Sequence, residues 1–183
     1  DASLIEEILE IDQEMEQLAG GTGTDRGSGG MASKLAAAKI ASWSGVRTVI
    51  ADASRVGVLV DACDDIPGVG TVIRARAGRL GARRLWIAFA GGSSGRIAVD
   101  AGARQALEER RVSLLPAGVV AATGEFDAGD AVELEGLDGE VFAKGLVRYD
   151  VETLRQNLGR RTTELPDGVS HEVVHADDLV VLP

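Results

Sequence analysis

The chain has 183 residues and a formal net charge of −10, and 45% of its residues are hydrophobic but only 3% aromatic. This length suits one large or two small domains with aliphatic cores. The acidic balance argues against non-specific nucleic-acid binding, because such proteins usually carry a basic face. The single cysteine, Cys63, excludes an intramolecular disulfide and fits a reducing cytoplasm. No apolar run approaches the roughly 20 residues of a membrane span, so we expect no membrane partner.

Residues 4–18 place apolar side chains near helical spacing with acidic residues between them, which predicts a helix or a pair of short helices. Their carboxylates show no repeated ligand spacing, so we interpret them as a solvated acidic face rather than a metal site. These acidic first residues do not resemble a signal peptide. Because the chain starts with aspartate instead of methionine, we expect a processed chain or a piece of a longer protein.

A glycine-rich loop passes directly into a helix at residues 20–45. Gly27, Gly29 and Gly30 lack a Cβ, so their backbone can approach a ligand closely. The unpaired N–H groups at a helix start, together with the helix dipole, favour anions and phosphate above all. Lys34, one turn into the helix, can add an ammonium group. The stretch therefore predicts a phosphate cradle with one cation, the alternative being a solvated linker before an ordinary helix.

The rest of the first half alternates helices and strands. We predict a helix over 32–44 that ends at Gly45, a strand over 46–51, a turn over 52–55 and a strand over 69–74. By pattern residues 56–63 fit either a strand or a helix, and the flanking Ser54 and Asp64-Asp65 favour a short helix. This order is typical of an α/β unit with a mostly parallel sheet.

The pattern changes after residue 75, and we place a domain boundary near residue 78. Residues 74–84 are interpreted as a basic linker. Strands are predicted over 85–89, 96–100, 118–124, 130–136, 140–150 and the C-terminal DDLVVLP, and helices over 101–111, with Asp100 as N-cap, and 151–159, ending at Gly159. The Asp138-Gly139 pair predicts a hairpin. Short strands at this spacing indicate a small barrel-like β domain.

Two groups of motifs follow one another in a specific order. The first is GSGGMASKLAAAKIASWSGVRTVIA at residues 27–51, and the second comprises RRLWIAF, GRIAVDAGARQAL, SLLPAGVVAATGEFDAGDAVEL, AKGLVRYD and VVHADDLVVL. In this order they resemble the C-terminal half of glutamate 5-kinase. The resemblance implies an α/β fold: the C-terminal part of an amino acid kinase α/β/α sandwich at residues 1–78, followed by a small mixed β-barrel PUA domain. It places the PUA core at 79–159 and a C-terminal tail with the last PUA strand at 160–183.

The resemblance also implies an activity and a site. Such enzymes are transferases that use ATP and Mg²⁺ to phosphorylate the side-chain carboxylate of L-glutamate, the first step of proline biosynthesis. It implies that Lys34 is catalytic and that the ATP phosphates bind at Ser28, Gly29, Gly30, Met31, Ala32, Ser33 and Lys34. The family usually has threonine where Ser28 stands and a Ser/Thr-Thr pair where Ala32-Ser33 stand, so the departures are mild.

Further expectations follow from the same resemblance. The family's first phosphate-binding loop, its glutamate-binding residues and its adenine-side motif all lie upstream of Asp1. We therefore expect the chain alone to be inactive, with an unpaired edge on its sheet. The resemblance implies a cytoplasmic homo-oligomer, a dimer or a tetramer, with proline as feedback inhibitor.

An RNA-binding PUA protein without kinase activity is the alternative, and a purely structural remnant of a kinase is a third interpretation. For RNA, the candidate phosphate contacts are Arg83, Arg84, Lys144 and Arg148, and the candidate stacking residues are Tyr149 and Trp86. The acidic balance and the scarcity of aromatic residues argue against RNA binding.

Residues 171–175 spell H-E-x-x-H, the zinc-protease signature, which requires a helix to place both histidines on one face. Pro166 and Gly168 precede the stretch, an Asp-Asp turn follows it, and no third ligand is apparent. We therefore interpret it as the approach to the final strand and expect no metal site.

Overall fold

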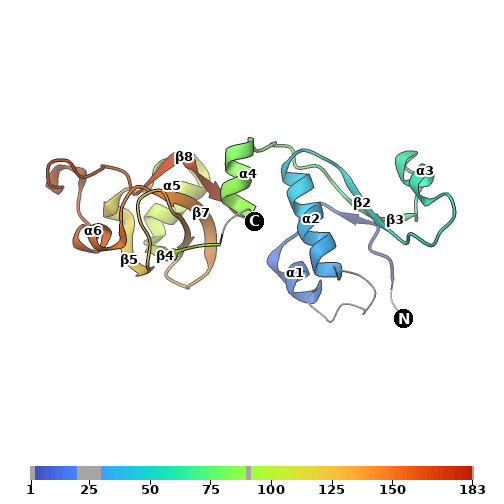
Figure 1. Ribbon diagram of the computed structural model, residues 1–183, viewed down its shortest axis with the longest axis horizontal. Helices are drawn as coiled ribbons and strands as arrows, with labels where there is room; N and C mark the ends of the chain where they lie inside the picture. Colours follow the sequence, from blue (N-terminus) through green and yellow to red (C-terminus); the bar gives the residue numbers. More distant parts are fainter. Residues whose placement is uncertain (1–2, 20–29, 90–91, 183) are drawn as a thin grey trace. The chain divides into compact units, whose positions relative to one another are not determined.

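The computed structural model describes residues 3–19, 30–89 and 92–182. The chain divides into two compact units between Gly81 and Ala82. Figure 1 identifies the elements of each unit along the chain. No helix among the described residues is both long and apolar enough to span a membrane.

The first unit is built on a three-stranded sheet in the order β1-β3-β2, formed by β1 (Glu7–Ile8), β2 (Thr48–Ala51) and β3 (Gly70–Ile73). Strand β1 runs parallel to β3, whereas β2 runs antiparallel to it. The expectation of a mostly parallel sheet is thus wrong for the described strands. The reason lies between β2 and β3, where α3 (Val58–Cys63) buries none of its side chains and so does not form a crossover packed on the sheet.

The N-terminal segment is only partly helical. Glu7–Ile8 pairs with β3, and helix α1 (Gln13–Ala19) begins after Asp12, whose carboxylate accepts a hydrogen bond from the Met15 N–H at 2.9 Å. The apolar spacing of residues 4–18 predicted a helix or a pair of short helices, but the structure has a short strand followed by one helix. Strand pairing prevails over the first part because it buries Ile8 in the core of the unit.

Helix α2 (Met31–Trp43) agrees with the helix predicted over 32–44. Ser44 is its C-cap, and the following Gly45 adopts φ +79°, a left-handed conformation that glycine accommodates without strain. The buried face of α2 contributes to a small core of five residues: Ile8, Ile11, Leu35, Ala38 and Ile73.

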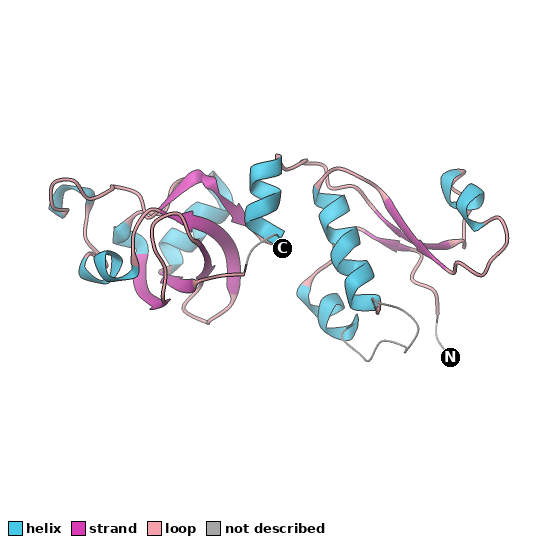
Figure 2. Ribbon diagram, in the orientation of Figure 1, coloured by secondary structure: helices cyan, strands magenta, loops and turns pink. Residues whose placement is uncertain are grey.

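The second unit contains a five-stranded sheet in the order β5-β4-β6-β7-β8. Figure 2 distinguishes the strands of this unit, in magenta, from its helices, in cyan. Its elements are α4 (Ala82–Phe89), β4 (Gly95–Val99), α5 (Ala101–Arg110), η1 (Pro116–Gly118), β5 (Val119–Gly124), β6 (Ala131–Glu135), β7 (Val141–Val147), α6 (Val151–Gln156), η2 (Thr162–Glu164) and β8 (Val174–Val181). Strand β4 runs parallel to β6, and the remaining neighbours in this sheet are antiparallel.

Two local features predicted in the second unit, a helix cap and a hairpin turn, are present in the structure. The Asp100 carboxylate caps α5 by accepting the Ala103 N–H at 2.7 Å. Gly139, in the hairpin between β6 and β7, adopts φ +79°, as its turn requires. Both predictions are confirmed because a cap and a tight turn depend on residues a few positions apart.

Residues 85–89 were predicted as a strand but belong to α4, so that prediction is wrong. Ile87 and Ala88 are buried and Arg84 is half-buried, a spacing of three and four residues that matches one helical face. The apolar run LWIAF has no polar residue that would reveal this period. The helical face of α4 can be recognised in the sequence only when Arg83 and Arg84, which precede this run, are included in the pattern.

Candidate phosphate site at the start of helix α2

The described part of the predicted site begins at Gly30, the N-cap residue of α2. Its backbone is extended, with φ −63° and ψ −169°, and among the described residues no side-chain hydrogen bond caps the helix. The first turn carries no acidic residue. The first N–H groups and the positive end of the helix dipole therefore have no competing carboxylate in that turn, which is the arrangement an anion requires.

The first turn is fixed by two hydrogen bonds to one carbonyl. The Ser33 hydroxyl donates to the Gly30 carbonyl oxygen at 2.9 Å, and the Lys34 N–H donates to the same oxygen at 3.4 Å. The turn therefore has a defined backbone, although its side chains from Met31 to Lys34 are exposed.

Two lysines on α2 have opposite environments. Lys39 forms an ion pair with Glu16, with 3.1 Å between Nζ and Oε1, and its side chain is only 11% exposed. Lys34 is exposed, and within the described part of the chain its ammonium group forms no ion pair. Of the two, Lys34 is the cation that remains accessible to a ligand.

The predicted ATP-binding residues fall into two groups. Gly30, Met31, Ala32, Ser33 and Lys34 lie together in the N-cap and first turn of α2. Ser28 and Gly29 lie outside the described residues.

Met31 also lines a groove of about 360 Å³ that sequence reasoning did not identify. The groove is predominantly apolar and includes Ile5, Leu18, Leu35 and Ile50. Ile5 and Leu18 are 58% and 79% exposed. The groove therefore suits an apolar surface rather than phosphate, and its signal in the sequence was the apolar pattern of residues 4–18.

A second cavity, of about 500 Å³, is also found in the first unit. Its lining contains none of the predicted site residues. Four of its charged side chains pair with one another, Arg47 with Asp65 and Arg74 with Glu7. These two arginines are thus already engaged, and we assign no ligand to the cavity.

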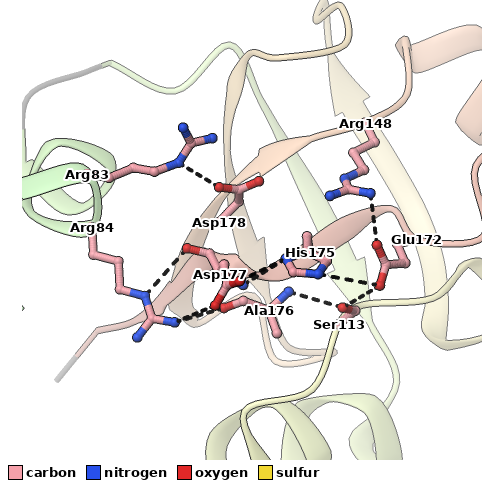
Figure 3. Close-up of polar contacts among 9 residues, drawn as sticks. All are labelled: Arg83, Arg84, Ser113, Arg148, Glu172, His175, Ala176, Asp177 and Asp178. Atoms are coloured by element: carbon pink, nitrogen blue, oxygen red, sulfur yellow. Dashed lines mark hydrogen bonds and ion pairs between the residues drawn. The ribbon is translucent and has the colours of Figure 1, made fainter. Parts of the chain in front are cut away.

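The H-E-x-x-H stretch is not helical. His171 to Val173 are irregular and His175 lies in β8, so the predicted approach to the last strand is confirmed. Glu172 accepts the Ser113 hydroxyl at 2.8 Å and pairs with Arg148 at 2.9 Å (Figure 3). His175 Nδ1 accepts the Asp177 N–H at 3.1 Å. The stretch thus ties β8 to neighbouring segments and does not place two histidines on one helical face.

The four cations considered for RNA contact all pair with carboxylates. The N···O distances are 2.7 Å for Arg83–Asp178, 3.5 Å for Arg84–Asp177, 2.9 Å for Arg148–Glu172 and 3.8 Å for Lys144–Glu133. Figure 3 shows three of these pairs around β8. Each arginine or lysine thus has a neutralising partner, which weakens its attraction for a phosphate backbone.

The aromatic candidates for base stacking differ. Trp86 is 52% exposed. Tyr149 is buried, its hydroxyl donates to the Ser170 carbonyl, and burial raises its pKa. Tyr149 therefore cannot stack on a base, and of the two candidates only Trp86 is exposed.

The chain is similar to two groups of known proteins, PUA domains and glutamate 5-kinases. Residues 95–169 match the PUA domain family. Glutamate 5-kinase of Mycobacterium avium is 44% identical over 171 residues, which cover 91% of this chain and 45% of that protein. Glutamate 5-kinase of Mycobacterium tuberculosis strain H37Rv is 42% identical over 183 residues, covering 100% of this chain and 47% of that protein. The chain thus spans about half the length of these curated relatives.

Among solved structures, a PUA domain from Aeropyrum pernix is 24% identical, with a TM-score of 0.36. The match covers 51% of this chain and 48% of that chain. The PUA domain is identified by the family match over residues 95–169.

Proposed function

We propose that this chain, in which residues 95–169 form a PUA domain and which is similar to glutamate 5-kinases over most of its length, is a portion of such an enzyme. The activity would be ATP-dependent phosphorylation of the L-glutamate side-chain carboxylate in proline biosynthesis. The observation that carries the proposal is the start of α2, where the first turn has no acidic residue, no side-chain cap from the described residues, and the exposed Lys34.

The geometry of this turn suits phosphoryl transfer. That reaction depends on positioned donors and cations around negative charge that spreads over phosphate oxygens. The N–H groups of the first turn would donate to the phosphates of ATP, and Lys34 would place its ammonium near the oxygens where charge develops. Because that charge grows as the bond to the leaving group breaks, Lys34 would stabilise the transition state more than bound ATP.

Magnesium belongs to the proposal, but no ligand in this chain is assigned to it. Among the described residues there is no group of three His, Cys, Asp or Glu side chains that could hold a metal ion. ATP phosphates supply oxygen ligands of the kind that Mg²⁺ prefers. The role of Lys34 and the helix start is derived without the metal.

The exposed apolar surface of the first unit supports the view that further protein belongs on it. Strands β1 and β2 form the edges of the described sheet, and the groove beside Met31 is open. We propose that the part of the longer relatives not represented in this chain covers this surface and completes the glutamate site. The 183-residue chain alone would then be inactive.

An assay of two proteins tests the proposal. The 183-residue chain and a version extended upstream to the length of its relatives would be compared for ATP- and glutamate-dependent acyl phosphate, trapped as the hydroxamate. We expect activity only in the extended protein. Glutamate phosphorylation by the short chain, or none by the extended one, would contradict the proposal.

The same proposal extends to assembly and regulation. As in the family that the sequence resembles, we propose a cytoplasmic homo-oligomer, a dimer or a tetramer, that proline inhibits. Light scattering of the extended protein would give its mass, and a proline titration of its activity would test inhibition. A monomer that is insensitive to proline would contradict this part alone.

A further inference from the structure

The segment after β3 is fastened to the C-terminal end of α2, although its sequence predicted a linker. We call residues 74–80 the strap. The Arg76 N–H donates to the Ser42 carbonyl oxygen at 3.0 Å, and the Leu80 N–H donates to the Trp43 carbonyl oxygen at 3.0 Å. These carbonyls belong to the last turn of α2, where an isolated helix leaves its acceptors unpaired. The strap therefore completes the end of the helix.

Side chains strengthen this attachment. The Ser42 hydroxyl, in a residue only 4% exposed, donates to the Arg74 carbonyl oxygen at 2.7 Å. The Arg76 guanidinium lies over the Trp43 ring, 4.2 Å from its centroid, and its Nη1 lies 3.7 Å from Glu10 Oε1. Trp43 is itself 2% exposed. A stack of a guanidinium on a buried indole is both attractive and directional, so it resists rotation of the helix end.

The two ends of α2 are held very differently. Its C-terminal end has the strap, whereas at its N-terminal end the described residues provide no side-chain cap and the first turn is exposed. Between them, the helix rests on the core through Leu35 and the small Ala38. Lys34 and Ser42 are eight residues apart, about 12 Å along a helix of 1.5 Å rise per residue. Because a helix of this length is stiff, the register set at one end is carried to the other.

We propose that the strap positions Lys34 and the first N–H groups of α2 by fixing the axial and rotational register of the helix. Ser42 and Arg76 are the positioning residues, acting through α2 without touching the ligand. This inference rests on the proposed function of the helix start. Catalysis is sensitive to such placement, since an error of about 1 Å can cost roughly 100-fold in rate.

The test uses the extended protein and Arg76→Met, which keeps an aliphatic stem on Trp43 but removes the guanidinium. We expect kcat/KM for ATP to fall about tenfold, within the range for small misplacements, while KM for glutamate stays within about twofold. Arg76→Lys should recover part of the loss, because a cation remains near Trp43 and Glu10. Arg47→Met is the matched control, because Arg47 pairs with Asp65 and donates a hydrogen bond to the Ala62 carbonyl oxygen, and neither partner belongs to the strap.

A double mutant separates positioning from general stabilisation. In a Lys34→Ala background, we expect Arg76→Met to lower kcat/KM for ATP less than about twofold, because the main group that it positions is gone. Full, additive loss in that background would overturn the inference. Ser42→Ala is a smaller change that should also lower kcat/KM for ATP. It keeps the inference testable if the Arg76→Met variant does not fold.

The inference and the proposed function fail in distinguishable ways. A wild-type extended protein without ATP-dependent glutamate phosphorylation would overturn both. An active wild type in which neither Arg76→Met nor Ser42→Ala changes kcat/KM for ATP would overturn the strap's role alone.

Discussion

The two units of the chain differ in how much of their apolar surface they enclose. In the second unit, a single cluster of 17 buried residues runs through the sheet and its helices, whereas the corresponding cluster of the first unit has five. Most of the large apolar side chains that stay exposed are in the first unit: Leu4, Ile5, Leu9, Leu18, Met31, Ile40, Val46, Val56, Leu59, Val60 and Ile66.

This difference indicates which unit can be stable by itself. Removing apolar area from water is the main favourable contribution to folding, about 25 cal/mol per Å². Four of the exposed side chains of the first unit, Leu4, Ile5, Leu18 and Met31, line the same apolar groove, and exposed apolar side chains gathered in this way are typical of a surface that another protein segment covers. The second unit thus has the properties of an independent domain, whereas the first has those of a partial one, and the proposed phosphate site lies in the partial one.

The largest expected effect concerns folding of the separated units. We expect residues 82–183 to unfold in one cooperative thermal transition, because their core is complete, and residues 1–81 to show none. Circular dichroism melts and amide NMR spectra of the two fragments would test this. A cooperative transition in fragment 1–81, or collapsed NMR signals from fragment 82–183, would contradict the comparison.

The next largest effect is expected from removing the lysine of the proposed phosphate site in the first unit. In the extended protein, we expect Lys34→Ala to lower kcat about 100-fold or more, roughly 3 kcal/mol, the scale of losing one preorganised donor. KM for ATP should rise less. Lys34→Arg should rescue only in part, because a planar guanidinium does not reproduce a point ammonium. Steady-state kinetics measures all three quantities.

Lys39→Ala is the control for Lys34→Ala, because Lys39 lies on the same helix but is engaged in an ion pair. Lys39 pairs with Glu16 and is largely buried, so its loss should lower the melting temperature while kcat stays near normal. Near-normal kcat in Lys34→Ala, or a larger loss of kcat in Lys39→Ala, would refute the phosphate site.

A smaller effect on the free energy of unfolding is expected when an isoleucine is replaced by valine in each of the two units. Ile97 is completely buried and Ile5 is 58% exposed. In the 183-residue chain, we expect Ile97→Val to cost about 1 kcal/mol of unfolding free energy and Ile5→Val less than about 0.5 kcal/mol. In the extended protein the cost of Ile5→Val should rise, because its groove would be covered. Equal costs for Ile5→Val in both proteins would argue against a covered groove.

The smallest effect is a pH dependence within the second unit. Hydrogen bonds from the side chain and backbone of Thr153 lower the pKa of Asp150, the N-cap of α6. A carboxyl whose folded pKa is lowered adds stability above its unfolded pKa, about 3.9, and that stability is lost as pH falls through the folded value. Asp150→Asn should cap the helix without this acid dependence. Denaturant titrations of fragment 82–183 between pH 5 and 2 would give the free energy of unfolding at each pH for the wild type and for Asp150→Asn. The same dependence of this free energy on pH in both proteins would contradict the prediction.

The sequence by itself determined the features that depend on neighbouring residues. It predicted α2, its end at Gly45, the cap at Asp100 and the hairpin at Asp138-Gly139, because helix propensity, caps and positive-φ glycines act over a few residues. It also placed Gly30 to Lys34 at a helix start, because adjacency along the chain fixes adjacency in a first turn.

Only the tertiary structure decided what depends on distant partners. Pairing with β3 made Glu7–Ile8 a strand, and packing against β8 made residues 85–89 part of a helix. The same holds for charges, since Arg83 is neutralised by Asp178, 95 residues away. The strap also depends on distant residues, because the Ser42 hydroxyl donates a hydrogen bond to the carbonyl oxygen of Arg74, 32 residues further along the chain. The physical reason is that sheet register, ion pairs and burial depend on which segments meet in space, and a local pattern does not contain that information.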